Sequence, residues 1–367
     1  MKRVTKVIIL IIISFALQSI VLICINNFYR SNKKVTYKWA DTSSKKKSSV
    51  QVDISMDARN IEVSSTGKFV SYYLGDSIHV KDINKNKDNI IKLDVPISNA
   101  SISWRIDDDK LMVITKKYSG LRVYTYDPKE NQLYKNRDAN NEWKLYPIES
   151  GYKVTGIEQN NKNTLIYLKL TKNDSKNYSF LKTFDITNEI NGINLPIHNI
   201  GNYYIFKAEN KVVFEDEVDK KIYMASNKIG THEWHMKPLK IQGVTGLKLL
   251  AVDDNGIVYV GKLINNKIST VYTCNISTRT SEGNSNKVEQ LNGSWNRVLL
   301  EENVDAKHIY ISDIGDMYII DNVNKKVINV KTGKEIAFKG EYKCMFGDSM
   351  GGGIISLDGN KLIEIEI

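Results

Sequence analysis

Four short stretches of this sequence combine residue types that carry chemistry in proteins. In the first, residues 347–349 form a Gly-Asp-Ser sequence with Gly351 nearby, which is close to the glycine-flanked serine of a nucleophilic hydrolase. Met350 occupies the position next to Ser349 where such a site needs glycine. Because glycine and aspartate are also typical turn residues, the stretch predicts a hairpin and no nucleophile.

The other three stretches offer groups that bind metal ions. His232 and His235 are three residues apart, but the segment is expected to enter a strand, where positions three apart point to opposite faces. Residues 107–109 and 253–256 are rich in aspartate, yet they lack the spaced acids and final glutamate of a calcium loop. Turn formation explains both acidic stretches, because Asp and Asn cap their own turns. We therefore expect no catalytic residue, no metal site and no cofactor.

A repeated pattern shows which elements would have to position any site. Six strand-like segments of alternating side chains each end in Asp or Asn, at steps of 45, 58, 42, 48 and 54 residues: Asp82, Asp127, Asp185, Asn227, Asn275 and Asn329. A repeat of roughly 50 residues made of strands is typical of a β-propeller blade. The chain is therefore predicted to be all-β, with its repeats arranged around a ring.

Seven repeat units can be counted, so we predict a seven-bladed β-propeller; six or eight blades remain open because the third and fourth units are irregular. The last unit ends after three strands, whereas residues 50–54 form a strand-like segment that belongs to no unit. An open ring would leave two unpaired strand edges. We therefore expect residues 50–54 to pair as the outermost strand of the carboxy-terminal blade.

Several segments resemble those of bacterial propellers with TolB-like or WD40-like blades, in particular STGKFVSYYLGDSIHVKDI and INVKTGK. The resemblance covers about residues 48–367 and implies only the fold, since the Gly-His and Trp-Asp pairs of true WD40 repeats are absent. The chain is also similar to the propeller half of prolyl-oligopeptidase-type enzymes. Their G-x-S-x-G nucleophile elbow is missing from the sequence.

The net charge of +10 lies almost entirely at the amino terminus. Residues 1–47 contain ten Lys or Arg and one acid, which leaves 42 basic and 41 acidic side chains in residues 48–367. A near-neutral propeller lacks the basic face that nucleic-acid binding requires. The sequence therefore predicts no nucleic-acid partner.

The amino-terminal segment indicates a membrane anchor. Residues 7–25 contain no charged side chain and are long enough to span a bilayer as one helix. A cleaved signal peptide is the alternative, but the apolar run continues beyond the small residues around Ala16. We therefore expect a cytoplasmic tail at 1–6, a transmembrane helix at 7–25, a basic juxtamembrane linker at 26–47 and a propeller at 48–367. Flanking charges mildly oppose export, but long domains translocate largely regardless of such charges, so an extracytoplasmic propeller is favoured.

Aromatic and thiol side chains offer fewer clues. Tyrosines that alternate within predicted strands are expected to pack inside the blades: Tyr124, Tyr126, Tyr259, Tyr310 and Tyr318. Four tryptophans lie at predicted strand edges and loops, where an exposed aromatic anchors a partner: Trp104, Trp143, Trp234 and Trp295. Cys24, Cys274 and Cys344 have no metal-type spacing; isolated thiols are expected, with a Cys274–Cys344 disulfide left open.

Two classes of function follow. The first is a single-pass cell-membrane protein whose extracytoplasmic propeller is a non-catalytic binding or scaffolding module for a protein or cell-envelope partner. The second is an enzyme, a hydrolase or lyase, whose site lies in the central channel and draws residues from several blades. The sequence alone cannot align the inner strands of different blades, so the structure must decide which groups meet.

Overall fold

The computed structural model describes Gln18 and residues 50–105, 108–118, 120–136, 145–160, 165–174, 178–185, 190–193, 195, 197–227, 234–276, 295–348 and 351–367. Within these residues, no helix is long and apolar enough to span a bilayer. The predicted transmembrane segment 7–25, apart from Gln18, and the linker 26–47 lie outside them. Residues 48–367 fall in one compact unit, which is the unit described below.

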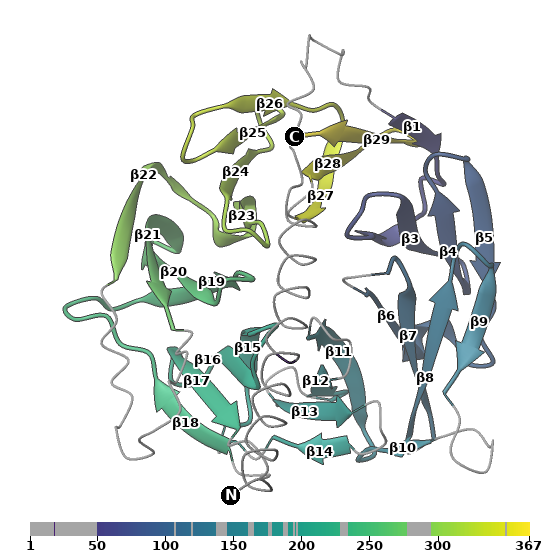
Figure 1. Ribbon diagram of the computed structural model, residues 1–367, viewed down its shortest axis with the longest axis horizontal. Helices are drawn as coiled ribbons and strands as arrows, with labels where there is room; N and C mark the ends of the chain where they lie inside the picture. Colours follow the sequence, from purple (N-terminus) through teal and green to yellow (C-terminus); the bar gives the residue numbers. More distant parts are fainter. Residues whose placement is uncertain are drawn as a thin grey trace, which may run out of the picture. The chain divides into compact units, whose positions relative to one another are not determined.

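The described strands form seven antiparallel sheets arranged around a ring (Figure 1). Each sheet is one propeller blade, and the blades are numbered by the chain order of their innermost strands. The strands of each blade are given from the innermost, called the first strand, outward. Blade 1 contains β2 (Arg59–Val63), β3 (Phe69–Leu74), β4 (Ser77–Asp82) and β5 (Lys87–Ile91). Blade 2 contains β6 (Ala100–Trp104), β7 (Leu111–Lys117) and β8 (Gly120–Asp127), with β9 (Gln132–Lys135) and β10 (Tyr146–Pro147) both paired to β8. Blade 3 contains β11 (Tyr152–Gln159), β12 (Leu165–Lys172), β13 (Ser179–Asp185) and β14 (Ile190–Gly192).

The remaining blades repeat the same order. Blade 4 contains β15 (Ile200–Ile205), β16 (Lys211–Asp216), β17 (Lys221–Asn227) and β18 (Trp234–Pro238). Blade 5 contains β19 (Leu247–Val252), β20 (Ile257–Ile264), β21 (Lys267–Asn275) and β22 (Asn296–Val304). Blade 6 contains β23 (Ile309–Ile311), β24 (Met317–Asp321), β25 (Lys326–Asn329) and β26 (Glu335–Ala337). Blade 7 contains β27 (Glu341–Asp348), β28 (Gly351–Asp358), β29 (Lys361–Glu366) and β1 (Val50–Asp53). Short 3₁₀ turns, η1 (Ile97–Asn99) and η2 (Ala306–His308), precede β6 and β23.

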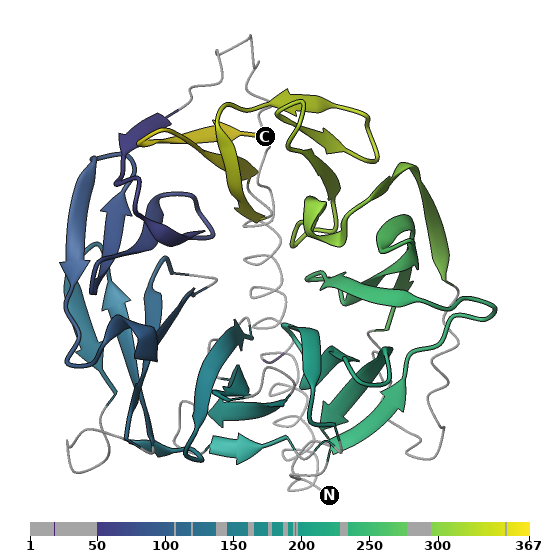
Figure 2. The same cartoon turned by 180° about the vertical axis from the view of Figure 1, so that it is seen from behind.

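The ring closes through β1, which pairs with β29 as the outermost strand of blade 7. Both views show the purple start of the propeller beside its yellow end (Figures 1 and 2). The seven-bladed count and the predicted closure are therefore confirmed. Closure removes the two free strand edges that an open ring would expose.

The periodic Asp and Asn residues end the third strand of blades 1 to 6. In blades 1, 2 and 6 these side chains cap the turn that follows, because the carboxylate or amide oxygen accepts from backbone N–H groups two or three residues later. Asp82 accepts from Lys85 at 3.0 Å, and Asn329 accepts from Lys331 at 3.0 Å. The repeat that identified the blades is therefore in part a repeat of turn caps; in blade 4 the side-chain oxygen of Asn227 has no hydrogen-bond partner among the described residues.

Seven apolar clusters hold the blades together, and each draws buried residues from two neighbouring blades. At the closing interface, for example, Val52 and Leu362 of blade 7 pack in one cluster with Val70 and Tyr72 of blade 1. The tyrosines expected to pack inside blades do so: Tyr124, Tyr126, Tyr259 and Tyr318 are buried, and Tyr310 is half-buried. The inner strands, which border the ring axis, are therefore held from both sides.

Candidate functional site

Antiparallel pairing gives the ring two distinct faces. Turns between first and second strands lie on one face, which we call the first-turn face. Turns between second and third strands lie on the opposite face, the second-turn face, together with the connections between blades. Charged side chains gather near the axis on both faces, and the largest sets come from blades 3 to 6.

The innermost strands are irregular where this polar region forms. The pairing of β2, β11, β15, β19 and β27 with their neighbours shifts register, as it does at a β-bulge. A bulge leaves one or more residues without a partner and re-aims nearby groups. In β15 the shift falls between Ile200 and Tyr203. The Gly201 carbonyl there accepts from Lys169 of blade 3, and the Asn202 backbone N–H donates to Glu215 of its own blade.

Lys207 centres the cluster on the first-turn face. It lies in the turn after β15, and its ammonium group is 2.8 Å from a carboxylate oxygen of Asp254 and 2.8 Å from one of Asp313. These acids lie in the equivalent turns of blades 5 and 6, so one lysine joins three blades. Its side chain is only 12% exposed. Burial lowers the pKa of Lys207, but Asp313 and Asp254 outweigh burial and raise it, so the lysine stays charged.

Glu158 brings a further carboxyl group toward this cluster. Its neighbour across the strand pair is Tyr167, which packs toward blade 4, so Glu158 faces blade 4 as well. Burial raises the pKa of Glu158 to about 7. The nearby charge of Lys207 lowers this pKa, and the charge of Asp313 raises it by a smaller amount. Near neutral pH this carboxyl is therefore able to hold or release a proton, as a general acid must.

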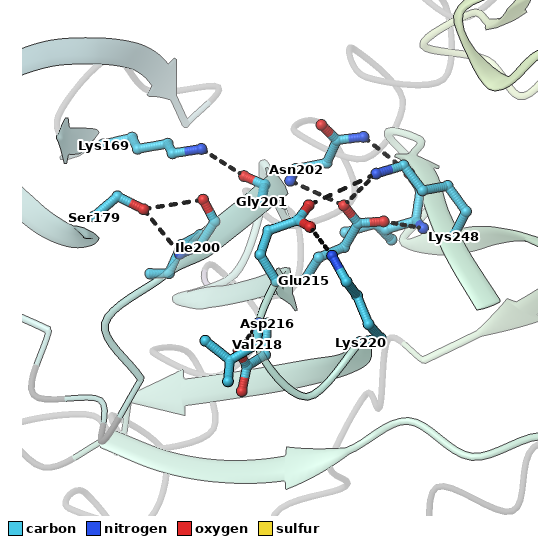
Figure 3. Close-up of polar contacts among 12 residues, drawn as sticks. Lys169, Ser179, Ile200, Gly201, Asn202, Glu215, Asp216, Val218, Lys220 and Lys248 are labelled. Atoms are coloured by element: carbon cyan, nitrogen blue, oxygen red, sulfur yellow. Dashed lines mark hydrogen bonds and ion pairs between the residues drawn. The ribbon is translucent and has the colours of Figure 1, made fainter. Parts of the chain in front are cut away.

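Glu215 centres the cluster on the second-turn face (Figure 3). One carboxylate oxygen accepts from the Lys248 ammonium at 2.8 Å and from the Asn202 backbone N–H at 3.1 Å. The other oxygen accepts from the Leu249 backbone N–H at 2.7 Å. Three donors from two blades thus satisfy a glutamate that is only 5% exposed, which is what a buried charge requires.

Neighbouring groups extend this cluster to blade 3. The Lys169 ammonium on β12 donates to the Gly201 carbonyl on β15 at 2.8 Å, as Figure 3 shows. Lys220 donates to Glu217 at 2.6 Å, and Glu217 also lies 3.9 Å from Lys248. A side chain at Gly201 would place its Cβ 2.4 Å from Glu217 and 2.8 Å from Glu215. A larger residue at this position would therefore require these carboxylate groups to shift.

Glu62 is a second inner-strand carboxyl with a shifted pKa. It lies on β2 opposite Ser71, and burial raises its pKa to about 7. The side-chain hydroxyl of Ser71 is buried and has no hydrogen-bond partner among the described residues. Glu62 and Glu158 sit on inner strands of different blades, and sequence analysis singled out neither.

The stretches singled out from the sequence behave mainly as turn formers. Asp348 pairs with Gly351 across the β27–β28 hairpin, as predicted, while Ser349 and Met350 lie outside the described residues. Asp253 accepts from the backbone N–H groups of Asn255 at 3.0 Å and Ile257 at 2.8 Å. The turn prediction for 253–256 is thus confirmed, but it missed the contact of Asp254 with Lys207.

Other acids and histidines among these stretches are scattered. Asp109 accepts from the Thr66 hydroxyl at 2.7 Å and so links blades 1 and 2, while Asp107 lies outside the described residues. His235 is exposed on the outer strand β18, and His232 lies outside the described residues. Within the described part of the chain, no group of three or more His, Cys, Asp or Glu side chains is arranged to hold a metal ion. Cys274 and Cys344 are free thiols.

The predicted partner-contact tryptophans are packed where they are described. Trp104 stacks on Phe69 with ring centroids 6.2 Å apart, and Trp234 meets Tyr167 edge-on at 6.4 Å. Trp295 is half-buried against the cluster between blades 4 and 5. Trp143 lies outside the described residues. Their role in partner binding stays a prediction.

Comparison with known proteins supports the fold alone. No family model matches the sequence, and no curated protein matches it. Among similar solved structures is an oligogalacturonate lyase in complex with manganese, with a TM-score of 0.56 and 13% identity over 87% of this chain and 90% of that chain. A streptogramin B lyase has a TM-score of 0.52 and 11% identity, covering 86% of this chain and 96% of that chain. The Swd1 β-propeller domain of Myceliophteria thermophila has a TM-score of 0.50 and 11% identity, covering 86% and 98%. The resemblance to WD40-like propellers is thus confirmed at the level of fold, which enzymes and non-enzymes share.

Proposed function

We propose that this protein is a single-pass membrane protein whose extracytoplasmic propeller is a non-catalytic binding or scaffolding module. One observation carries the non-catalytic part: Lys207 and Glu215 use their charges in contacts that join blades. A lysine held between two carboxylates is kept protonated and is a poor base or nucleophile. A glutamate that accepts from three donors is likewise held in place.

The proposed placement rests on the amino-terminal sequence. Residues 7–25 supply an apolar segment of membrane-spanning length, and the propeller itself is near neutral. A rigid ring held at the membrane offers its turns as a surface for a protein or cell-envelope partner. Loops on a rigid scaffold are where binding residues concentrate.

An enzyme is the second candidate, and Glu158 and Glu62 favour it. A carboxyl with a pKa of about 7 is suited to general acid catalysis near neutral pH. In an enzyme, Glu158→Gln would abolish the cellular function while leaving the folded protein at its normal level. In a binding module, the same variant is expected to retain function.

Protease shaving of intact cells tests the proposed placement. The propeller is expected to be digested along with a known surface protein, while a cytoplasmic protein in the same cells stays intact. A propeller that survives while the surface protein disappears would show that the topology is inverted. Recovery of the chain in the soluble fraction of lysed cells would overturn the anchor itself.

A further inference from the structure

Exposed apolar side chains gather on the second-turn face of the propeller. Four connections between second and third strands carry one each, in the turn itself or, for Ile264, at the last residue of β20. We call these the apolar tips: Tyr118 (85% exposed), Val218 (72%), Ile264 (41%) and Val323 (89%). Met56, in the connection from blade 7 to blade 1, lies on the same face and is 74% exposed. Among the described residues, the turns of the opposite face expose only one large apolar side chain, Ile314 at 49%.

The apolar tips are not needed to form these turns. The equivalent turns of blades 1 and 7 contain Gly75-Asp76 and Gly359-Asn360, which are typical turn residues. Tyr118 has a positive φ of 54°, a conformation that is costly for a bulky residue. Such a side chain departs from the residue types that turns favour, and because it is exposed it gains no packing energy that would compensate. This combination points to a functional role.

Lysines accompany every apolar tip. Each of the four turns has a lysine within three residues of its tip: Lys117, Lys220, Lys267 and Lys325. Lys117 pairs with Asp94, and Lys220 with Glu217, at exposed positions; such surface pairs contribute at most about 1 kcal/mol. Lys267 and Lys325 form no ion pair within the described part of the chain. Positive charge without a paired acid among the described residues therefore lies beside Ile264 and Val323, while beside Tyr118 and Val218 the lysine is shared with an acid.

We infer that the second-turn face docks onto the surface of a lipid bilayer with anionic headgroups. A planar surface contacts the turns of several blades together, because all of these turns lie on one face of the ring. Apolar tips enter the boundary between headgroups and acyl chains, and the adjacent lysines meet lipid phosphates. The inference rests on the proposed membrane anchor, because a tether raises the effective concentration of the bilayer and makes weak docking sufficient.

Fluorophore burial in the full chain tests the inference. Val323→Cys and Ile314→Cys are each labelled with an environment-sensitive fluorophore and reconstituted into vesicles of phosphatidylcholine and phosphatidylglycerol. The unsubstituted chain, labelled in parallel, corrects for Cys24, Cys274 and Cys344. The label at 323 is expected to gain emission by about threefold relative to the label at 314, and a quencher attached to the lipid chains should reach only the former.

A second variant keeps the test independent of the label. Tyr118→Ser combined with Val218→Ser removes two exposed side chains, leaves the core untouched, and is expected to reduce shielding at 323 by about half. Equal emission from both labels would overturn the inference. The exposed apolar tips would then have to bind a partner other than a lipid bilayer. Flotation with the vesicles separates the two proposals. A chain that floats with an unshielded label keeps its anchor but does not dock, whereas a chain that does not float contradicts both.

Discussion

Val52 lies directly opposite Leu362 in the antiparallel pairing of β1 with β29. Both side chains are buried in the cluster between blades 7 and 1. The first strand of the propeller therefore completes the sheet formed by the last three strands. Ring closure depends on this one strand pair, since every other blade is built from consecutive strands.

A charge at Val52 should open the ring. Val52 is 3% exposed, so Val52→Asp places an unpaired carboxylate in an apolar interface and is expected to lower the free energy of unfolding by about 3 kcal/mol or more. Gln51→Asp is the matched control, because Gln51 is exposed on the same strand; its effect is expected to stay within about 0.5 kcal/mol. Denaturant unfolding of the full chain measures both.

Deletions test the same closure more coarsely. Removing residues 48–55, or the last eight residues, leaves an unpaired strand edge and should sharply lower the thermal unfolding temperature. Removing residues 26–45 should not. If the chain without residues 48–55 unfolds at the temperature of the intact chain, β1 does not close the ring in solution.

Loss of the Glu215 carboxylate should loosen blades 4 and 5. Glu215→Ala leaves Lys248 and the Leu249 N–H without their acceptor, and breaking a buried charged pair in this way costs about 3 to 5 kcal/mol of unfolding free energy. Glu217→Ala is the control, because Glu217 is 33% exposed and its pair with Lys220 lies at the surface; about 1 kcal/mol or less is expected. Equal losses of unfolding free energy from the two variants would show that Glu215 does not hold blades 4 and 5 together.

The raised pKa of Glu158 predicts a pH dependence of stability. The ordinary value is 4.5 and the folded value about 7, so the folded chain binds this proton more tightly than the unfolded chain does. The resulting stabilisation is fully present below pH 4.5 and is lost as the pH rises through about 7. Thermal unfolding of the Glu158→Gln variant should therefore show a smaller fall in this range than the unsubstituted chain.

Glu62 offers an independent check of this pH dependence. Its pKa is also about 7, and it lies on another blade, so Glu62→Gln should remove a separate share of the slope. Because the two sites are apart, the shares should add in the double variant. A double variant with the full pH slope would show that neither carboxyl is responsible.

The fold could be predicted from sequence because its signals are local. Alternation along a strand and a turn cap at its end both arise from neighbours in the chain, as in the strand that ends at Asp82. Even the long-range pairing of β1 followed from one leftover strand and one incomplete blade. Such evidence needs no knowledge of which side chains meet across blades.

The charged clusters could not be predicted because their members meet only after the ring forms. Asp254 has a typical turn sequence, and nothing near it in the chain indicates Lys207. Glu158 resembles any exposed strand residue until the neighbouring blade buries it. Strand-edge tryptophans were candidates for partner contact from the sequence, which could not show that a neighbouring blade packs against one of them, as Tyr167 of blade 3 meets Trp234 of blade 4.

The central claim is that charges near the axis hold the ring together, and Lys207 tests it most directly. Lys207→Met removes the ammonium shared by Asp254 and Asp313. Denaturant unfolding is expected to show a loss of about 3 kcal/mol or more, because two partly buried carboxylates lose their partner. Lys85→Met, at a pair in which the lysine side chain is 77% exposed, should lose about 1 kcal/mol or less. A Lys207→Met chain as stable as the Lys85→Met chain would contradict the account, because the contacts of Lys207 with Asp254 and Asp313 would then not stabilise the ring.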